Sequence, residues 1–336
     1  MIDLKRKRNL DPIAKDWLKW VREYLFTPRS GNARPRLINN GRTYLFNSYA
    51  DKLDASLLVL VKDYAKGNTT VFLWVKSQIG WFWSHLDYVI LATPAQMRAW
   101  INAWARHRLR YPKNLISKLK EVLVPYYEAI SREYGYQLID RLNVRTCPYC
   151  NRQYVISYEA LSKERPELDH FFPKAKYPMF CLSFYNLIPA CHSCNHVKLE
   201  RMIGVNPYEN GFNTTFIITD KRGRKLSKSK IFHLTEKEIC LDFKNPTHDE
   251  KKNIEVLGLD AVYNKHKDYV KELIDKTMAY DKFARETLID AFQGAGYHPR
   301  QVYDFVWGRH LLDAEHEDRP LSKLTKDILD ELEVRR

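Results

Sequence analysis

The sequence predicts a mainly α-helical protein that contains one small module of mixed α and β structure. Twelve glycines in 336 residues is a low count, and long segments place apolar side chains at helical spacing. Two Cys-x-x-Cys pairs, Cys147 with Cys150 and Cys191 with Cys194, interrupt this pattern and enclose short segments of strand character. We therefore expect helical regions on both sides of a compact module that carries the chemistry.

The chain has a large excess of positive charge. Its formal net charge is +14 and its isoelectric point is near 9.3. A field of this sign attracts polyanions, so nucleic acid is the first partner to consider, although a merely basic protein would have the same net charge. Hydrophobic residues make up 45% of the chain and charged residues 29%, which predicts packed domains rather than disorder.

The composition does not favour a secreted or a membrane protein. The first eight residues lack the apolar segment of a signal peptide. The longest apolar runs, 71–83 and 88–92, fall short of the roughly 18 residues that a membrane span needs. Four of the six cysteines lie in two close pairs, which is not the spread of a disulfide framework. We expect a cytoplasmic protein without a membrane partner.

The region 1–140 reads as a helical domain with no chemistry of its own. Helices are expected over 11–26, with Asp11 as the N-cap, over 51–83, over 95–110 and over 114–134, where Pro125 should kink or split the helix. One short strand is expected at 43–46. The third helix carries a row of basic residues that contacts phosphate or simply faces solvent: Arg98, Arg106, Arg108, Arg110 and Lys113.

The region after the cysteines divides into two parts. Segments 214–219 and 229–234 read as two strands of a hairpin joined by a basic turn, and helices resume from 249 to a short terminal helix at 320–329. We expect four units: a helical docking or recognition domain at 1–140, the mixed module at 141–205, a basic hairpin insertion at 206–248 and a helical region at 249–336.

The four paired cysteines predict a structural zinc site. Zn²⁺ takes four thiolates in a closed tetrahedron, and two Cys-x-x-Cys pairs about forty residues apart supply them. A redox dithiol would explain one pair and leave the other unexplained. A closed site has no position for substrate, so this zinc should clamp the first pair onto the helix that begins near Cys191. Cys181 and Cys240 are expected in the core.

An Asp-His pair stands between the two cysteine pairs. Segments 153–158 and 167–172 have strand character, so Asp169 and His170 are expected on a hairpin. Asn195 follows in the first turn of the next helix, where backbone N–H groups favour a phosphate. A carboxylate, an imidazole and an amide would then converge. An Asp-His pair alone would more simply cap the hairpin; its spacing from Asn195 and the cysteines favours a catalytic role.

These residues resemble the HNH endonucleases, whose fold is the ββα-metal motif. The resemblance lies in Asp169-His170, Asn186 and Asn195, at gaps of sixteen and nine residues inside the cysteine pairs. It implies that His170 is the general base that activates water, that Asp169 and Asn195 hold a catalytic Mg²⁺ or Mn²⁺, and that Asn186 braces the loop carrying His170. Asn195 stands where the family often has His, giving a His-Asn-Asn set that also occurs there.

The residue types suit hydrolysis of a phosphodiester. A metal on hard oxygen ligands stabilises the developing charge, while an imidazole with an unperturbed pKa near 6.5 takes a proton from water at neutral pH. Lys174 and Lys198 are possible phosphate contacts, and Lys198 should share the helix face of Asn195 because it follows three positions later. His196 is the weaker candidate for a ligand, since it points about a hundred degrees away from Asn195.

A narrower resemblance extends beyond this motif. The segments 147–152, 168–174, 185–191, 263–267 and 320–328 are similar to the HNH subunit of Septu-type and retron-linked anti-phage systems. That resemblance implies a defence nuclease acting with an ABC/AAA-type ATPase, with DNA as the first expected substrate. Two alternatives stay open: a toxin that cleaves RNA such as tRNA with the same site, and a zinc-knuckle module that binds nucleic acid without cutting it.

Overall fold

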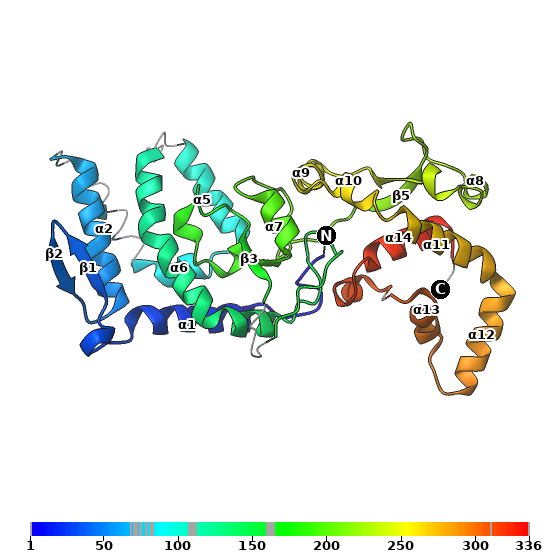
Figure 1. Ribbon diagram of the computed structural model, residues 1–336, viewed down its shortest axis with the longest axis horizontal. Coiled ribbons are helices and arrows are strands. Elements are labelled where there is room, and N and C mark those ends of the chain that lie inside the picture. The colour runs from blue at the N-terminus through cyan, green and yellow to red at the C-terminus, as the bar shows by residue number, and fades with distance from the viewer. Residues whose placement is uncertain are drawn as a thin grey trace.

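The chain folds mainly into helices, arranged along one long axis with the amino terminus near the middle (Figure 1). This computed structural model describes residues 2–334 except residues 68, 70–72, 74–75, 78–79, 81–83, 107–112, 159–164 and 310. For residues 104–106, 113, 114 and 300 it describes the backbone alone. The aromatic end of the second expected helix, 81–83, and the expected basic side chains Arg106, Arg108, Arg110 and Lys113 therefore lie outside the described residues.

The amino-terminal part is helical, as its sequence predicts. Helix α1 packs on α2 and α6, which lie toward one end of the molecule (Figure 1). The described helices of this part are α1 (Asp11–Phe26), α2 (Tyr49–Ala65), α4 (Leu86–Ile90), α5 (Pro94–Arg106) and α6 (Lys113–Leu142).

Three local expectations for these helices need correction. The helix expected over 51–83 ends at Ala65, because its C-cap residue Lys66 turns the backbone into the left-handed region with a φ of 46°. The N-cap of α1 is Leu10, which offers no side-chain cap, and the Asn9 side chain instead accepts the Asp11 N–H at 3.1 Å. Asp11 is already helical because Pro12, in the first turn, has no N–H that would need a cap. Of the two outcomes expected at Pro125, a kink or a split, the split is wrong, because α6 runs as one helix from Lys113 to Leu142.

The described strands form three small antiparallel sheets of two strands each. One hairpin near the amino terminus includes the expected strand at 43–46, and its partner strand was not predicted. The other two sheets join strands far apart in sequence. The strand pairs are β1 (Arg36–Asn39) with β2 (Arg42–Leu45), β3 (Glu167–His170) with β4 (Leu187–Ala190), and β5 (Thr215–Thr219) with β6 (Cys240–Lys244).

Two expected hairpins are wrong. Strand β3 pairs with β4, and segment 153–158 contributes only a single bridge from Tyr154 to Thr146. Strand β5 pairs with β6, while 229–234 contains the short helix α8 (Lys228–Phe232) instead of a return strand. In each case the real partner begins about twenty residues after the strand it pairs with, and its pairing depends on packing that the local pattern does not show.

The carboxyl-terminal part is helical again, as predicted from residue 249 onward. Helix α9 begins with a reciprocal capping box between Thr247 and Glu250 and ends at Gly258, whose φ of 59° suits glycine. Besides α8, the described helices after Cys191 are α7 (His192–Lys198), α9 (His248–Leu257), α10 (Leu259–Tyr263), α11 (Lys267–Ala279), α12 (Lys282–Gly294), α13 (Pro299–Trp307) and α14 (Ser322–Glu331). The described 3₁₀ turns are Gly31–Ala33, Pro178–Phe180, Phe184–Asn186, Glu236–Glu238 and Asp313–Asp318.

A continuous hydrophobic core connects both ends of the chain through the cysteine region. The first residues thread into its centre: the Ile2 N–H donates to Pro148 O and the Leu4 N–H to Pro207 O, each at 2.9 Å. Burial of Leu4, which has no exposed surface, fixes this segment against the mixed module. Among the described helices, none combines the length and the apolar character needed to cross a membrane.

Candidate metal centre and adjoining pocket

The four paired cysteines come together in the folded chain. Their sulfur atoms all lie within 4.8 Å of one another, and Cys150 Sγ and Cys191 Sγ are 3.9 Å apart. All four side chains are buried. Four thiolates at these spacings match the donor set and size of a tetrahedral zinc site, so the cluster could hold a zinc ion. Within the described part of the chain it is the one group of three or more His, Cys, Asp or Glu side chains close enough together to hold a metal.

The first cysteine pair lies in a tight turn of residues 147–151, here called the knuckle, which is hydrogen-bonded to several other parts of the chain. Asn151 adopts a φ of 49°, which turns the chain sharply after Cys150, and its side-chain N–H₂ donates to Thr146 Oγ1 and His316 O. The Asn151 carbonyl also accepts the Leu321 N–H at 2.6 Å, just before α14. The Tyr263 hydroxyl donates to Cys150 O. These contacts therefore tie the knuckle to the carboxyl-terminal helical part of the chain.

The remaining two cysteines lie apart from the cluster. Cys181 is 1% exposed and its thiol points toward Leu123 O at 3.8 Å, as expected for a core residue. Burial raises the pKa of the Cys181 thiol to about 12, so it stays protonated. Cys240 is the first residue of β6 and is only partly buried. It was expected in the core, and it lies at the edge of the core instead.

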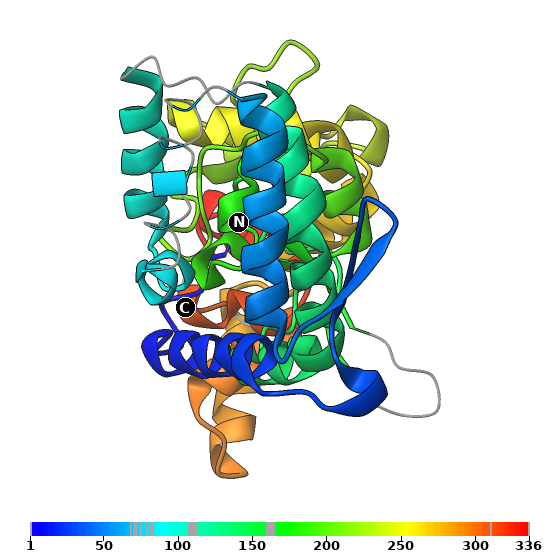
Figure 2. The same cartoon turned by 90° about the vertical axis from the view of Figure 1, so that its left-hand side faces the viewer.

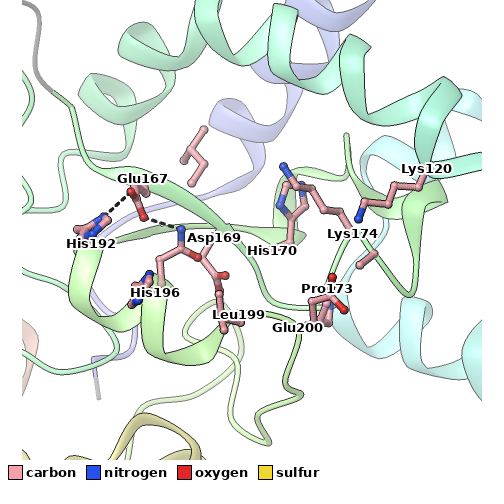
Figure 3. Close-up of a pocket in the computed structure, with 13 residues that line it drawn as sticks. Lys120, Glu167, Asp169, His170, Pro173, Lys174, His192, His196, Leu199 and Glu200 are labelled. Atoms are coloured by element: carbon pink, nitrogen blue, oxygen red, sulfur yellow. Dashed lines mark hydrogen bonds and ion pairs between the residues drawn. The ribbon is translucent and has the colours of Figure 1, made fainter. Parts of the chain in front are cut away.

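A pocket of about 330 Å³ opens beside the metal centre. Its lining comes from β3, from the segment that follows β3, from α7 and the two residues after it, and from Lys120 on α6 (Figure 3). Strand β3 pairs with β4 so that Asp169 faces Ile188 and His170 faces Leu187. Helix α7 starts at the second cysteine pair, with Cys191 as its N-cap. Two strands and a helix thus bring Asp169, His170 and Asn195 to one pocket.

Asp169 is held by two side chains on its buried side. The Tyr149 hydroxyl, from the cysteine knuckle, donates to Asp169 Oδ2 at 2.7 Å, and Lys198 Nζ lies 3.1 Å from Oδ1. Burial raises the pKa of the Asp169 carboxyl, and the Lys198 ammonium and the Tyr149 hydroxyl oppose that rise. Each carboxylate oxygen keeps a second lone pair, so Asp169 can still accept a ligand from the pocket.

The position of Lys198 differs from the expected phosphate contact. Its side chain has no exposed surface, and its ammonium also donates to His170 O at 2.6 Å. Lys198 therefore faces the core rather than the pocket side of Asn195. Its charge balances Asp169 and ties α7 to β3, because a buried ammonium needs a paired carboxylate and hydrogen-bond acceptors.

His170 is buried at the pocket wall in a defined tautomer. Its Nε2 lies 3.0 Å from Cys181 O, and because a carbonyl only accepts, Nε2 carries the proton and Nδ1 the lone pair. The Tyr127 ring packs edge-on against the imidazole at 4.5 Å between centroids. Burial lowers the pKa of His170 to about 3, which corrects the unperturbed value assumed from sequence. The imidazole is consequently neutral across the physiological pH range.

Asn186 lies outside the pocket and spans the loop that follows His170. Its Oδ1 accepts the Phe172 N–H at 2.7 Å, and its Nδ2 donates to Phe172 O at 3.1 Å and to Phe180 O at 3.0 Å. The side chain is completely buried. These three hydrogen bonds fix the path of the chain on both sides of the loop, so Asn186 acts on His170 through the backbone.

Asn195 is oriented by a residue that the sequence did not single out. Its Nδ2 donates to Glu167 Oε2 at 2.5 Å, which leaves Oδ1 as the free acceptor. The other oxygen of Glu167 lies 2.8 Å from His192 Nδ1, and this contact raises the pKa of His192 (Figure 3). Strand β3 places Glu167 two residues before Asp169, where alternation gives both the same face. The two-residue spacing between Glu167 and Asp169 on one strand is the sequence signal that could have identified Glu167 as a site residue.

Two lysines, Lys120 of α6 and Lys174, line the far end of the pocket, together with the carboxylate of Glu200 (Figure 3). Lys174 Nζ lies over the Tyr127 ring at 5.1 Å and 3.7 Å from Glu128. Lys120 could not be found from the motif, because it lies about fifty residues earlier in the sequence and reaches the pocket only through the packing of α6. His196, expected to point away from Asn195, also lines the pocket.

Known proteins provide no further guide to this site. No family model, no curated protein and no solved structure matches the chain.

Proposed function

We propose that the chain is a metal-dependent endonuclease of the HNH type that hydrolyses phosphodiester bonds in nucleic acid. The observation that carries the proposal is the convergence of Asp169, His170 and Asn195 from two strands and one helix on a single pocket. The basic side chains of Lys120 and Lys174 at the same pocket suit an anionic substrate.

Each residue has a role that its contacts support. His170 accepts a proton from water at Nδ1, since Nε2 is engaged with Cys181 O and holds the ring in the required tautomer. Asp169 and the free Oδ1 of Asn195 are hard oxygen donors that would hold Mg²⁺ or Mn²⁺. The bound metal would supply stabilisation of the charge that develops on the phosphate. Lys174 and Lys120 contact the flanking phosphates.

The four-cysteine centre has a structural role in this proposal. The closed thiolate set leaves no coordination position for substrate, and its knuckle supplies Tyr149, which hydrogen-bonds to Asp169. Zinc would therefore hold the wall of the catalytic pocket without touching the reacting groups.

DNA is the substrate that we propose, cleaved as part of an anti-phage defence system with an ABC/AAA-type ATPase partner. The defence role and the ATPase rest on the sequence resemblance alone. The same pocket would serve cleavage of RNA such as tRNA, and a non-catalytic zinc-knuckle module would need neither the Asp169 hydrogen bonds nor the fixed tautomer of His170.

The test is incubation of the purified full chain with plasmid DNA, single-stranded DNA and tRNA, each with Mg²⁺, with Mn²⁺ and with excess chelator. We expect metal-dependent cleavage of DNA to products with 5′-phosphate ends. Cleavage of tRNA alone would replace the DNA proposal with the RNA one. Absence of cleavage by a folded, zinc-loaded chain, alone and with the product of the neighbouring reading frame, would leave the binding module as the better account.

A further inference from the structure

The β1–β2 hairpin forms a short, well-defined ribbon at one end of the molecule (Figure 2). Its two-residue turn is Asn40-Gly41, with φ values of 49° and 74°, the combination that a tight type I′ turn requires. The register pairs Arg36 with Leu45 and Ile38 with Thr43. These four side chains share one face, because side chains alternate along each strand.

That face is exposed and combines positive charge with apolar surface. Ile38 is 74% exposed and Leu45 48%. On the opposite face, Leu37 and Asn39 are partly buried and line, with Ile38, a groove against α2 and α6, whereas their partners Tyr44 and Arg42 are exposed. The ribbon is thus anchored through β1, while all of β2 is exposed.

The charge of the ribbon is not compensated. Residues 27–48 contain four arginines and no acidic residue. Arg36 and Arg42 are exposed, and neither has an ion pair or hydrogen bond from its side chain to another described residue. By contrast, the groove beneath the ribbon carries both signs, from Lys52 and Lys118 against Asp63 and Glu121. The unpaired charge therefore lies on the ribbon itself.

We propose that the β1–β2 ribbon docks duplex DNA by entering its major groove, with Ile38 toward the bases and two arginines on the phosphates: Arg36 from the same face, and Arg42 from the opposite face, where it is exposed beside the turn. The major groove of B-form DNA admits a two-stranded ribbon, and exposed apolar side chains there contact thymine methyl groups. The major groove of A-form RNA is too narrow for side chains to read. The positive charge of the ribbon therefore favours a polyanion as its ligand. The shape of the ribbon favours duplex DNA over duplex RNA, because only the major groove of B-form DNA is wide enough to admit it.

The ribbon and the catalytic pocket lie on two sides of the same helix. On α6, Lys118 lines the groove beneath the ribbon and Lys120 lines the pocket. Residues two apart point about 200° from each other around a helix that is about 10 Å wide. The ribbon would therefore hold a duplex on the side of α6 away from the pocket, as a second contact with DNA outside the site of cleavage. The inference rests on the proposed nuclease function only in naming duplex DNA as the substrate class.

Binding can be measured without cleavage. The full chain carrying His170→Ala is titrated with a 30-base-pair DNA duplex and with the RNA duplex of the same sequence, from about 0.05 to 0.3 M salt. The Arg36→Gln/Arg42→Gln variant should weaken DNA binding by on the order of tenfold and lower the slope of log affinity against log salt by about 2, one unit for each lost phosphate contact. Ile38→Glu, at a site already exposed, should weaken DNA binding similarly.

The matched control is Lys221→Gln/Arg222→Gln, which removes the same charge from an exposed turn in the other half of the chain, beyond β5. It should leave both the affinity and the slope nearly unchanged. The proposal is overturned if both double variants weaken binding equally, if the ribbon variant binds as tightly as its parent, or if RNA binds as well as DNA with the same dependence on the ribbon. Failure of cleavage with this binding pattern intact would count against the nuclease proposal alone.

Discussion

The hydroxyl of Tyr149 donates a hydrogen bond to Asp169 Oδ2 at 2.7 Å, inside the protein and without access to solvent from the tyrosine side. Tyr149 lies between the cysteines of the first pair, so one residue links the candidate zinc centre to the carboxylate proposed to bind the catalytic metal. A buried hydrogen bond to a charged group is typically worth about 1.5–3 kcal/mol. The two halves of the site are therefore coupled through Tyr149.

Tyr149→Phe should separate catalysis from zinc binding. The variant keeps the ring in the core but removes the hydrogen bond to Asp169, so nuclease activity should fall by about 10- to 100-fold while the zinc content stays at one per chain. Activity is measured at saturating Mg²⁺ and at several lower concentrations.

Tyr208→Phe is the matched control for this change. Tyr208 is also buried, and its hydroxyl donates to Leu187 O at 2.8 Å without touching Asp169. Its variant should lose comparable stability and keep its activity. Equal loss of activity in both variants would show that a general weakening of the core, rather than the Asp169 contact, is responsible.

Lys198→Met should destabilise the fold strongly. Removing the ammonium leaves Asp169 as an uncompensated buried charge, which typically costs about 3–5 kcal/mol. Urea unfolding curves give the free energy of unfolding, and the double variant Lys198→Met/Asp169→Asn should recover much of the loss because both charges are gone. If the double variant is as unstable as the sum of the two single variants, the pair is not coupled as described.

Glu167→Ala should raise the concentration of Mg²⁺ or Mn²⁺ needed for half-maximal activity. Glu167 fixes Asn195 so that Oδ1 is free, and loss of such a supporting contact typically costs 10- to 100-fold in metal affinity. Glu200→Ala removes the same charge from the lining of the same pocket. A matching shift in the Glu200 variant would identify overall charge, and not the orientation of Asn195, as the cause.

The free energy of unfolding should fall in acid through His316. This side chain is 5% exposed, and burial lowers its pKa to about 4, against an unfolded value near 6.5. Between these values the unfolded chain binds a proton that the folded chain does not, so stability decreases as the pH falls, by at most about 1.4 kcal/mol per pH unit.

Urea unfolding at pH 7 and pH 5 measures this slope. His316→Gln should lower the slope by at most about 1.4 kcal/mol per pH unit and leave the contribution of His170, whose pKa burial also lowers, whereas His248→Gln, at an exposed position, should leave the slope unchanged. An unchanged slope in the His316 variant would contradict the linkage.

The sequence predicted the parts of this fold that depend on local pattern. The helices follow apolar spacing, and the four-cysteine cluster follows from two pairs of fixed spacing, because a short chain segment constrains where such side chains can point. Which strands pair depends instead on packing between segments that are separate in the sequence. The expected partners of β3 and β5 were therefore wrong, and the structure pairs these strands with β4 and β6. Lys198 shows the same limit, since its helical position relative to Asn195 does not reveal that β3 covers it.

The central claim is that His170 is the general base of a nuclease, and a single comparison tests it most directly. Wild type and His170→Ala are compared for the rate of DNA cleavage with Mg²⁺, after both are shown to be folded and to hold equal zinc. The account predicts a loss of about 10²- to 10⁴-fold in rate for the variant. Equal, chelator-sensitive cleavage by the two proteins would contradict it.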